Sequence, residues 1–265
     1  MDIDFTGKVV LITGASAGIG EATALLFAKL GAQLALVGRN EVNLRNVAER
    51  CERERGLKPL QIVADLGTDE GADKTAKQTL EYFGRLDVLV NNAGISARTC
   101  IEHTDMATFD DVFRVDVRGV YNLTRQLVPA LVRSKGNIVN VSSIAATVTV
   151  VGNLPYAMAK AALDQFSRAI ALELAPKGVR VNTVSPGLTR SEILKRITGY
   201  SDEEYEAWLQ KTAATVVPMG QACEGLDIAK MIVHLASDHS RLVSGTTVQV
   251  DGCARFCSSW TEYMK

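Results

Sequence analysis

The sequence predicts a single α/β domain built on a doubly wound, seven-stranded parallel sheet. Short runs rich in β-branched residues alternate with longer helical patterns along the whole chain. Several of these runs are apolar almost throughout, which is typical of strands that are covered on both faces of a sheet. No linker rich in Pro, Gly or Ser divides the 265 residues, so one domain spanning 1–265 is expected.

The elements are expected in the order strand, helix, strand, because each apolar run is followed by a longer amphipathic stretch. Strands joined through helices form right-handed crossovers, which makes them parallel. The predicted strands, chosen for their β-branched and apolar content, are 9–12, 34–37, 61–64, 88–90, 137–141, 179–184 and 247–250. The predicted helices, chosen for their helical periodicity, are 19–30, 40–55, 70–83, 106–133, 155–175 and 225–236.

One segment, residues 188–220, interrupts this alternation. It is long for a connection within a compact domain, and such insertions usually have a function. It contains aromatic residues at Tyr200, Tyr205 and Trp208, and a helix start is indicated at Ser201. We expect a substrate lid there, since ligands bind beyond the carboxyl ends of the strands in such sheets. The alternative is a surface helical hairpin without a ligand role.

The composition argues against several classes of protein. Lys and Arg total 29 and Asp and Glu total 30, so nucleic-acid or membrane-surface binding is not expected as the main task. The acidic N-terminus does not have the pattern of a signal peptide, and no apolar stretch is long enough to cross a bilayer. The five cysteines are scattered and form neither a disulfide framework nor a metal site, which favours a cytoplasmic location.

A glycine-rich turn follows the first predicted strand. It reads Thr-Gly-Ala-Ser-Ala-Gly-Ile-Gly over residues 13–20 and leads directly into a helix. Gly14, Gly18 and Gly20 would let the backbone turn tightly and approach a pyrophosphate closely, and the helix N-terminus offers N–H groups to that anion. The alternative is that these glycines serve only the packing of the helix on the sheet.

This turn is one of a set of motifs in which the chain resembles the classical short-chain dehydrogenase/reductase family. The resemblance runs from about Phe5 to Gly252, with every motif in the order typical of the family, and it implies a Rossmann-like fold and a nicotinamide cofactor. The other motifs are Asn-Asn-Ala-Gly at 91–94, Ser143, Tyr-Ala-Met-Ala-Lys at 156–160 and Ser-Pro-Gly at 185–187.

The resemblance also implies which residues bind the cofactor. The turn would hold the pyrophosphate, the ends of the third and fourth strands would hold the adenosine, and the segment after the sixth strand would hold the nicotinamide. The implied contacts are Gly14, Ser16, Gly18, Ile19, Gly20, Asp65, Leu66, Asn91, Ala93, Gly94, Tyr156, Lys160, Pro186, Gly187, Leu188 and Ser191. Structural alternatives exist for three of them: Asp65 could cap a helix, and Asn91 and Gly94 could stabilise the central strands, a role that is compatible with a cofactor contact.

The end of the second strand favours NADP(H) over NAD(H). An acidic residue at this position binds both ribose hydroxyls in the NAD-preferring pattern, but here the chain reads Val-Gly-Arg-Asn over 37–40. Arg39 could pair bidentately with a 2′-phosphate. Its alternative role is to cap an exposed turn, and Ala17 lies where NADP-binding relatives often carry a second basic residue.

Tyr156 and Lys160 lie four residues apart on a predicted helix and therefore share one face. A free Tyr has a pKa of about 10. A neighbouring ammonium group would stabilise its phenolate, so the pair could give a proton to a carbonyl oxygen or take one from an alcohol. Ser143, at the end of the fifth strand, could hold the substrate oxygen.

Asp116 is a departure from the family pattern, which has Asn within Val-Asn-x-x-Gly. The residue in relatives is thought to fix a water next to the catalytic Lys. An ionised Asp would raise the pKa of Lys160 and oppose a Tyr156 phenolate, and Arg114 or Arg118 could neutralise it. A silent, nearly isosteric replacement is the alternative. Asp116 is therefore kept among the catalytic candidates.

The sequence as a whole predicts an NADP-preferring carbonyl reductase or alcohol dehydrogenase. The expected substrate is a small hydrophobic ketone or secondary alcohol, such as a steroid-like, acyl or xenobiotic compound. We also expect a homodimer or homotetramer assembled through the long helices 106–133 and 155–175. One alternative is a cofactor-binding regulatory protein with little turnover. Another is a sugar epimerase or dehydratase, which the short C-terminal region disfavours.

Overall fold

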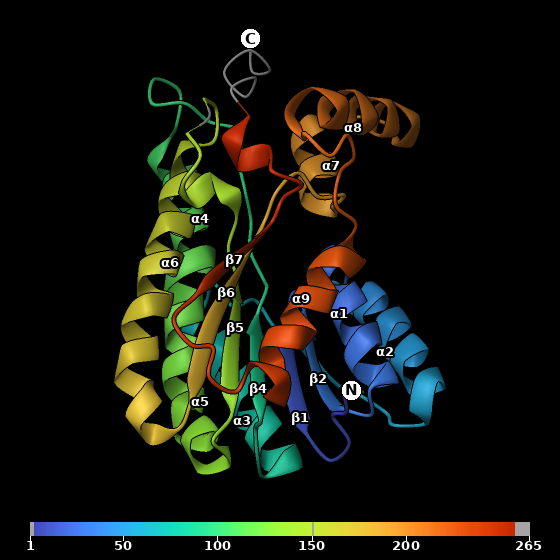
Figure 1. Ribbon diagram of the computed structural model, residues 1–265, viewed down its shortest axis with the longest axis vertical. Helices are drawn as coiled ribbons and strands as arrows, with labels where there is room; N and C mark the ends of the chain where they lie inside the picture. Colours follow the sequence, from blue (N-terminus) through green and yellow to red (C-terminus); the bar gives the residue numbers. More distant parts are fainter. Residues whose placement is uncertain (1–2, 150, 258–265) are drawn as a thin grey trace.

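A computed structural model describes residues 3–149 and 151–257 and contains the predicted doubly wound parallel sheet (Figure 1). The strands are paired in the order β3-β2-β1-β4-β5-β6-β7, and every neighbouring pair is parallel. Their bounds are β1 (Val9–Thr13), β2 (Gln33–Gly38), β3 (Leu60–Val63), β4 (Val88–Asn91), β5 (Asn137–Val141), β6 (Arg180–Pro186) and β7 (Thr247–Val250). The prediction of a single seven-stranded α/β domain is confirmed.

Helices cover both faces of the sheet, and each face has its own apolar core. Helices α1, α2 and α9 pack together on one face, while α4, α5 and α6 lie on the other, with α3 against α5 (Figure 1). Their bounds are α1 (Gly18–Lys29), α2 (Glu41–Arg55), α3 (Asp69–Phe83), α4 (Met106–Phe113), α5 (Val120–Ser134), α6 (Leu154–Leu174) and α9 (Gly225–Ala236). Burial on both faces explains why the strands are apolar almost throughout.

The predicted helix 106–133 is wrong in one respect, because it is not one regular α-helix. Between α4 and α5 the chain forms a π-helical turn, η1 (Arg114–Gly119). A wider turn of this kind occurs frequently at functional sites. Here it contains Asp116, whose carboxylate accepts a hydrogen bond from the Ile95 N–H at 2.8 Å. Gly119 lets the turn pack directly against the Leu66 carbonyl group, which any side chain would strike.

The excursion between β6 and α9 folds into two helices, α7 (Glu192–Thr198) and α8 (Asp202–Val216), which lie beyond the carboxyl end of β6 (Figure 1). The predicted helix start at Ser201 is confirmed, because Ser201 and Glu204 form a reciprocal capping box. The two helices have a small apolar core of their own, which includes Tyr205, Leu209 and Leu188. Among the described residues, no helix is both long and apolar enough to span a membrane.

Candidate active site

A cavity of about 910 Å³ lies over the carboxyl ends of the central strands. Its wall is assembled from segments that are far apart in the sequence: the glycine-rich turn, the ends of β2 to β6, the start of α6, and the helices α7 and α8. The carboxyl ends of parallel strands meet at one edge of a sheet, and helix N-termini gather there as well. This explains why most of the predicted site residues, which are dispersed along the chain, converge on this cavity.

The glycine-rich turn forms an open cradle at one end of the cavity. Gly14 and Gly18 have positive φ angles of 65° and 59°, which other residues rarely adopt. A Cβ atom at Gly14 would lie 2.8 Å from Asn92 Nδ2, so the close packing of the turn requires glycine. Helix α1 begins at Gly18 without a side-chain cap. Its first N–H groups can therefore bind an anion such as a pyrophosphate.

The predicted contacts in this turn do not all reach the cavity. Gly14, Ser16, Gly18 and Ile19 line its wall. Gly20 does not: it is buried, and a Cβ atom there would strike the Gly14 carbonyl oxygen. Gly20 thus keeps the helix close to the turn, which is the packing role considered as an alternative.

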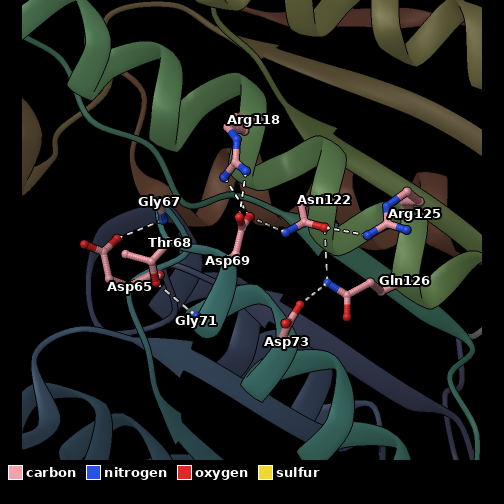
Figure 2. Close-up of polar contacts among 10 residues, drawn as sticks. All are labelled: Asp65, Gly67, Thr68, Asp69, Gly71, Asp73, Arg118, Asn122, Arg125 and Gln126. Carbon is pink, nitrogen blue, oxygen red and sulfur yellow. Dashed lines mark hydrogen bonds and ion pairs between the residues drawn. The ribbon is translucent and has the colours of Figure 1, made fainter.

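The adenosine end of the cavity is lined by Arg39, Asp65 and Leu66. Arg39 is exposed, and no ion pair to it occurs in the described part of the chain. Asp65 accepts a hydrogen bond from the Gly67 N–H at 2.9 Å (Figure 2). Its other oxygen lies 3.7 Å from the Arg114 guanidinium group. The α3 helix is capped by Thr68 rather than by Asp65. The geometry leaves the Arg39 guanidinium available to an anionic ligand.

Asn91 lies behind the wall rather than in it. Ala93 and Gly94 line the cavity, but the Asn91 side chain is buried and donates hydrogen bonds to Thr124 Oγ1 and Asn140 Oδ1 at 3.1 and 2.9 Å. The Asn91 side chain therefore has the scaffold role, and a contact of its backbone with the cofactor stays a prediction. Its neighbour Asn92 donates to the Thr13 carbonyl at 2.8 Å and so fixes the glycine-rich turn against β4.

Ser143, Tyr156 and Lys160 line one wall of the cavity together. Ser143 follows β5, and Tyr156 and Lys160 project from the first turns of α6. The Ser143 hydroxyl accepts the Ala145 N–H at 3.1 Å, and as a neighbour of the Tyr156 phenol it lowers the pKa of that group. The ammonium group of Lys160 lies 5.4 Å from the centre of the Tyr156 ring and donates to the Val141 carbonyl at 3.2 Å. A hydroxyl donor, a phenol and a cation thus face the same cavity.

Asp116 forms a buried ion pair with the lysine of this group. Its Oδ2 atom lies 3.0 Å from Lys160 Nζ, and the two side chains are 0% and 5% exposed. Asp116 itself does not line the cavity, so it acts on the site through Lys160. A Cβ atom at Gly94 would lie 2.9 Å from Asp116 Oδ2, so glycine is needed there for the pair to fit.

The arginines considered as neutralising partners of Asp116 are engaged elsewhere. Arg118 forms an ion pair with Asp69 on α3 at 2.7 Å (Figure 2). Arg114 pairs with Asp111 at 3.0 Å and lies near Asp65. The expectation that one of them could balance Asp116 is wrong, because both point to the surface while Asp116 points inward to Lys160.

The buried charges set the proton affinities of the site. Burial raises the pKa of Asp116, while Lys160 and the Ile95 N–H oppose that rise. For Lys160, burial is the largest single influence and disfavours the ammonium group, but Asp116, Tyr156 and Asp164 together outweigh it, so the pKa of Lys160 is raised. The raised pKa of Asp116 favours its neutral carboxyl form, whereas the raised pKa of Lys160 favours its charged ammonium form. The short contact and the second hydrogen bond to the carboxylate favour the ion pair at neutral pH.

Tyr156 is more difficult to ionise than a free tyrosine. Burial raises its pKa; the Lys160 ammonium group opposes this, and the Asp116 carboxylate adds to it. Lys160 therefore stabilises the phenolate as expected, but its effect is outweighed. A tyrosine in this environment stays protonated at neutral pH and can donate a proton to an oxygen atom in the cavity.

The segment after β6 provides the far end of the wall. Pro186, Gly187, Leu188 and Ser191 all line the cavity. A Cβ atom at Gly187 would lie 2.8 Å from the Asp251 backbone, so only glycine allows this close approach. The Ser191 hydroxyl accepts the Leu194 N–H at 3.3 Å and begins α7. This hydroxyl already has a structural partner within the chain.

Several wall residues could not be found from the sequence. They share a position in loops or on α7 and α8, where no motif marks them. The wall also contains Ser96, Arg98, Ile144, Asn153, Arg196, Trp208 and Lys211. Of these, only Trp208 carried a signal, as one of the aromatic residues within 188–220. The described residues contain no cluster of His, Cys, Asp or Glu side chains that could hold a metal ion.

Comparisons with known proteins agree with this geometry. The model of a protein family described as enoyl-(acyl carrier protein) reductase matches residues 14–254. A 3-oxoacyl-[acyl-carrier-protein] reductase of Thermotoga maritima is 34% identical over 93% of this chain and 97% of its own length. These matches cover the glycine-rich turn, the catalytic candidates and both helices of the excursion.

Solved structures show the same fold. A short-chain dehydrogenase/reductase of unknown function from Caenorhabditis elegans, solved with cofactor, is 35% identical and superposes with a TM-score of 0.90. It covers 96% of this chain and 97% of its own. The L-sorbose reductase of Gluconobacter frateurii, solved with NADPH and L-sorbose, is 32% identical, with a TM-score of 0.89 and coverage of 95% and 98%.

Proposed function

The chain belongs to the short-chain dehydrogenase/reductase family of oxidoreductases, and we propose that it is an NADP(H)-dependent carbonyl reductase. Its substrate would be a small hydrophobic ketone or the corresponding secondary alcohol. The observation that carries this proposal is the meeting of Ser143, Tyr156 and Lys160 on the wall of a cavity that also contains the glycine-rich cradle.

The residues of the cradle fit a dinucleotide. The open α1 N-terminus, with glycine required at Gly14, suits a pyrophosphate, while Asp65 and Leu66 lie where an adenosine would follow. Gly187 and Leu188 would contact the nicotinamide. When bound, the reduced nicotinamide supplies a hydride to the carbonyl carbon.

The chain's own side chains would handle the oxygen and the proton. Ser143 would donate a hydrogen bond to the carbonyl oxygen as negative charge develops there. Tyr156 would then give that oxygen its phenolic proton, and the resulting phenolate would be stabilised by the Lys160 ammonium group, which lies 5.4 Å from the ring centre. Oxidation of an alcohol would use the same groups in reverse.

The proton affinity of Tyr156 favours the reductive direction. Burial and the Asp116 carboxylate raise its pKa, so the phenol is present as the acid at neutral pH. Oxidation needs the phenolate and would therefore become efficient only in alkaline solution. This is the basis for describing the protein as a reductase rather than as an alcohol dehydrogenase.

NADP(H) would be preferred because of Arg39. This exposed guanidinium lines the adenosine end of the cavity without a carboxylate partner among the described residues. A 2′-phosphate would fit such a group as a bidentate partner, whereas the 2′-hydroxyl of NAD(H) would leave its charge unused. NAD(H) remains the less favoured cofactor.

The substrate region is lined by apolar groups on several sides. Ile144, Leu188 and Trp208 come from three different segments and face the cavity beside the catalytic wall. They would bury the carbon skeleton of a substrate, and α7 and α8 would act as the lid. An apolar skeleton is therefore proposed, although Ser96 and Asn153 provide polar groups within the same wall.

We also propose a homodimer or homotetramer in the cytoplasm. Large apolar side chains are exposed on the outer faces of α5 and α6, for example Tyr121 at 56% and Leu172 at 81%. A second copy of the chain could cover them. Light scattering at micromolar protein concentration would test this, and a monomer would contradict it.

The proposed activity can be tested with a panel of ketones and aldehydes. The purified protein should oxidise NADPH in the presence of at least one carbonyl compound, more efficiently than NADH, as followed by nicotinamide absorbance. Cofactor binding, measured separately by calorimetry, distinguishes the two main outcomes. Tight NADPH binding with no turnover across the panel would contradict the proposal and favour a cofactor-binding regulatory protein.

A further inference from the structure

The basic residues of α7, α8 and the loop before them fall into two groups. Arg190 forms ion pairs with Glu206 and Glu224, and Lys195 forms one with Asp202. Neither of these two cations lines the cavity. They stabilise the two helices as surface ion pairs do, and their charges are already balanced within the fold.

Arg196 and Lys211 form the second group. Both are exposed, both line the cavity, and neither has an ion pair or side-chain hydrogen bond within the described part of the chain. Arg98, in the loop after β4, has the same three properties. Three cations from three separate segments therefore face one cavity without a partner among residues 3–149 and 151–257. Within these residues, acidic side chains pair with the two cations outside the wall, Arg190 and Lys195, and not with the three on it.

The countercharge within this part of the wall is small. Glu192 is the acidic side chain that shares it, and it lies in the first turn of α7, where the helix N-terminus already favours a negative charge. Asp65 and Arg39 belong to the adenosine end, and Lys160 is paired with Asp116. Among the residues that the structure describes, the substrate region thus has three unpaired cations against one carboxylate, which produces a positive potential inside a cavity with apolar walls.

We propose that the substrate carries an anionic group, a carboxylate or a phosphate ester, attached to an apolar skeleton that bears the carbonyl. This inference rests on the proposed function and refines its substrate class. Arg98, Arg196 and Lys211 would hold the anion, while Ile144, Leu188 and Trp208 would cover the skeleton. Guanidinium groups bind both anions through paired hydrogen bonds, so the two kinds of anion share one recognition chemistry.

Three aromatic aldehydes with one common ring test this proposal: 4-formylbenzoate, 4-formylphenyl phosphate and the neutral methyl 4-formylbenzoate. Their binding is measured by calorimetry to the protein saturated with NADP⁺, which cannot reduce them. Saturation also removes Arg39 from competition for the anion. At least one of the two anions should bind more tightly than the ester, and the stronger of them identifies whether carboxylate or phosphate is preferred.

Neighbouring residues on α7 provide a matched pair of variants. Arg196→Gln and Lys195→Gln each remove one positive charge, but only Arg196 lines the cavity. Arg196→Gln should weaken binding of the preferred anion roughly 2- to 5-fold, and a combined Arg196→Gln and Lys211→Gln variant should weaken it further. Lys195→Gln should leave binding of the anion unchanged, and none of these variants should alter binding of the ester.

Equal binding of the anions and the ester, or no binding of any of them, would overturn the anion-binding assignment. The assignment is also overturned if Lys195→Gln and Arg196→Gln weaken binding of the anion equally, because the two charges would then act only at a distance and not by contact with the ligand. Failure of the proposed function is detected separately, as a protein that binds the anions in its NADP⁺ complex but reduces none of the three aldehydes with NADPH.

Discussion

Two groups of charged residues lie in or directly behind the wall of the same cavity, and they differ in almost every physical respect. Lys160 and Asp116 are buried and 3.0 Å apart, and buried pairs are screened by salt much less than exposed ones. Arg196 and Lys211 are exposed and have no partner among the described residues. Burying an ion is costly unless it is paired, whereas an exposed ion can remain unpaired at little cost. The comparison teaches that the surroundings of a charge decide whether it can tune a proton or attract a ligand.

The largest effect is expected from breaking the buried pair. Lys160→Ala leaves the Asp116 carboxylate buried without its cation, and such a loss destabilises a protein by about 3–5 kcal/mol. It also removes the cation next to Tyr156, so turnover should fall about 10²-fold or more. Urea denaturation and NADPH-dependent reduction would measure the two losses.

A second variant separates these effects. Combining Lys160→Ala with Asp116→Asn removes both charges, so much of the stability should return while the activity should not. If activity returned together with stability, Lys160 would be a structural residue and not a part of the catalytic group.

A smaller effect, on pH dependence, is expected from Asp116→Asn. The groups that face Tyr156 are Lys160 on α6, Ser143 after β5 and, through Lys160, Asp116 on η1; Asp164 on α6 also faces Lys160. Removing the Asp116 carboxylate takes away a charge that raises the pKa of Tyr156, so this pKa should fall. Reduction needs the protonated phenol, so its alkaline limb should move to lower pH. The pH at which alcohol oxidation sets in should also move to lower pH, because oxidation needs the phenolate, which would then form at lower pH.

The measurement is kcat/KM against pH in both directions, at saturating cofactor. Superimposable profiles of the natural protein and Asp116→Asn would show that the carboxylate does not influence Tyr156. An upward shift of either limb would contradict the sign of the electrostatic argument.

Arg39→Ala tests the cofactor end. A hydrogen bond to a charged group contributes about 1.5–3 kcal/mol, so NADPH binding should weaken roughly 10- to 100-fold while NADH binding stays nearly unchanged. Arg45→Ala is the matched control, since Arg45 is an exposed arginine on α2 outside the cavity wall. Calorimetry with both cofactors provides the comparison. Equal affinities of the natural protein for NADPH and NADH would refute the preference.

The smallest expected effect is that of salt, and it distinguishes the two groups of charges directly. At 1 M ionic strength the screening length is about 3 Å, so any preference of the exposed cations for an anionic aldehyde should shrink. The pH shift caused by Asp116→Asn should persist, because the pair is buried. The preference for the anionic aldehyde and the pH shift are each measured at low and at high salt. If both disappeared at high salt, the distinction between exposed and buried charges would be contradicted.

Much of the fold could be predicted because strand and helix periodicity are local properties of the sequence. The predicted strand 179–184 extends in the structure to Pro186 in β6, a difference at the boundary only. The π-helical turn η1 could not be predicted, since it depends on contacts of Asp116 and Gly119 with residues that are distant in the sequence. Local patterns therefore predict the elements but not the irregular turn that carries an important carboxylate.

The candidate site was predictable wherever a motif marks the backbone. Ser143, Tyr156 and Lys160 were named from the sequence, and all three line the cavity. For Asn91 the sequence predicts a contact beside a scaffold role, and it is the scaffold role that the buried side chain has, because a motif indicates a position on a strand and not the direction of the side chain. Arg98 and Arg196 were missed, since loops and short helices come together only through the tertiary fold.

The central claim is that Tyr156 gives the proton that accompanies hydride transfer to a carbonyl compound, and Tyr156→Phe tests it most directly. This variant keeps the ring and its packing and removes only the hydroxyl group. Single-turnover reduction of a carbonyl substrate by bound NADPH should slow by about 10²- to 10⁴-fold, while NADPH binding should be unchanged. A folded Tyr156→Phe variant that binds NADPH and reduces the same carbonyl at nearly the natural rate would contradict the claim.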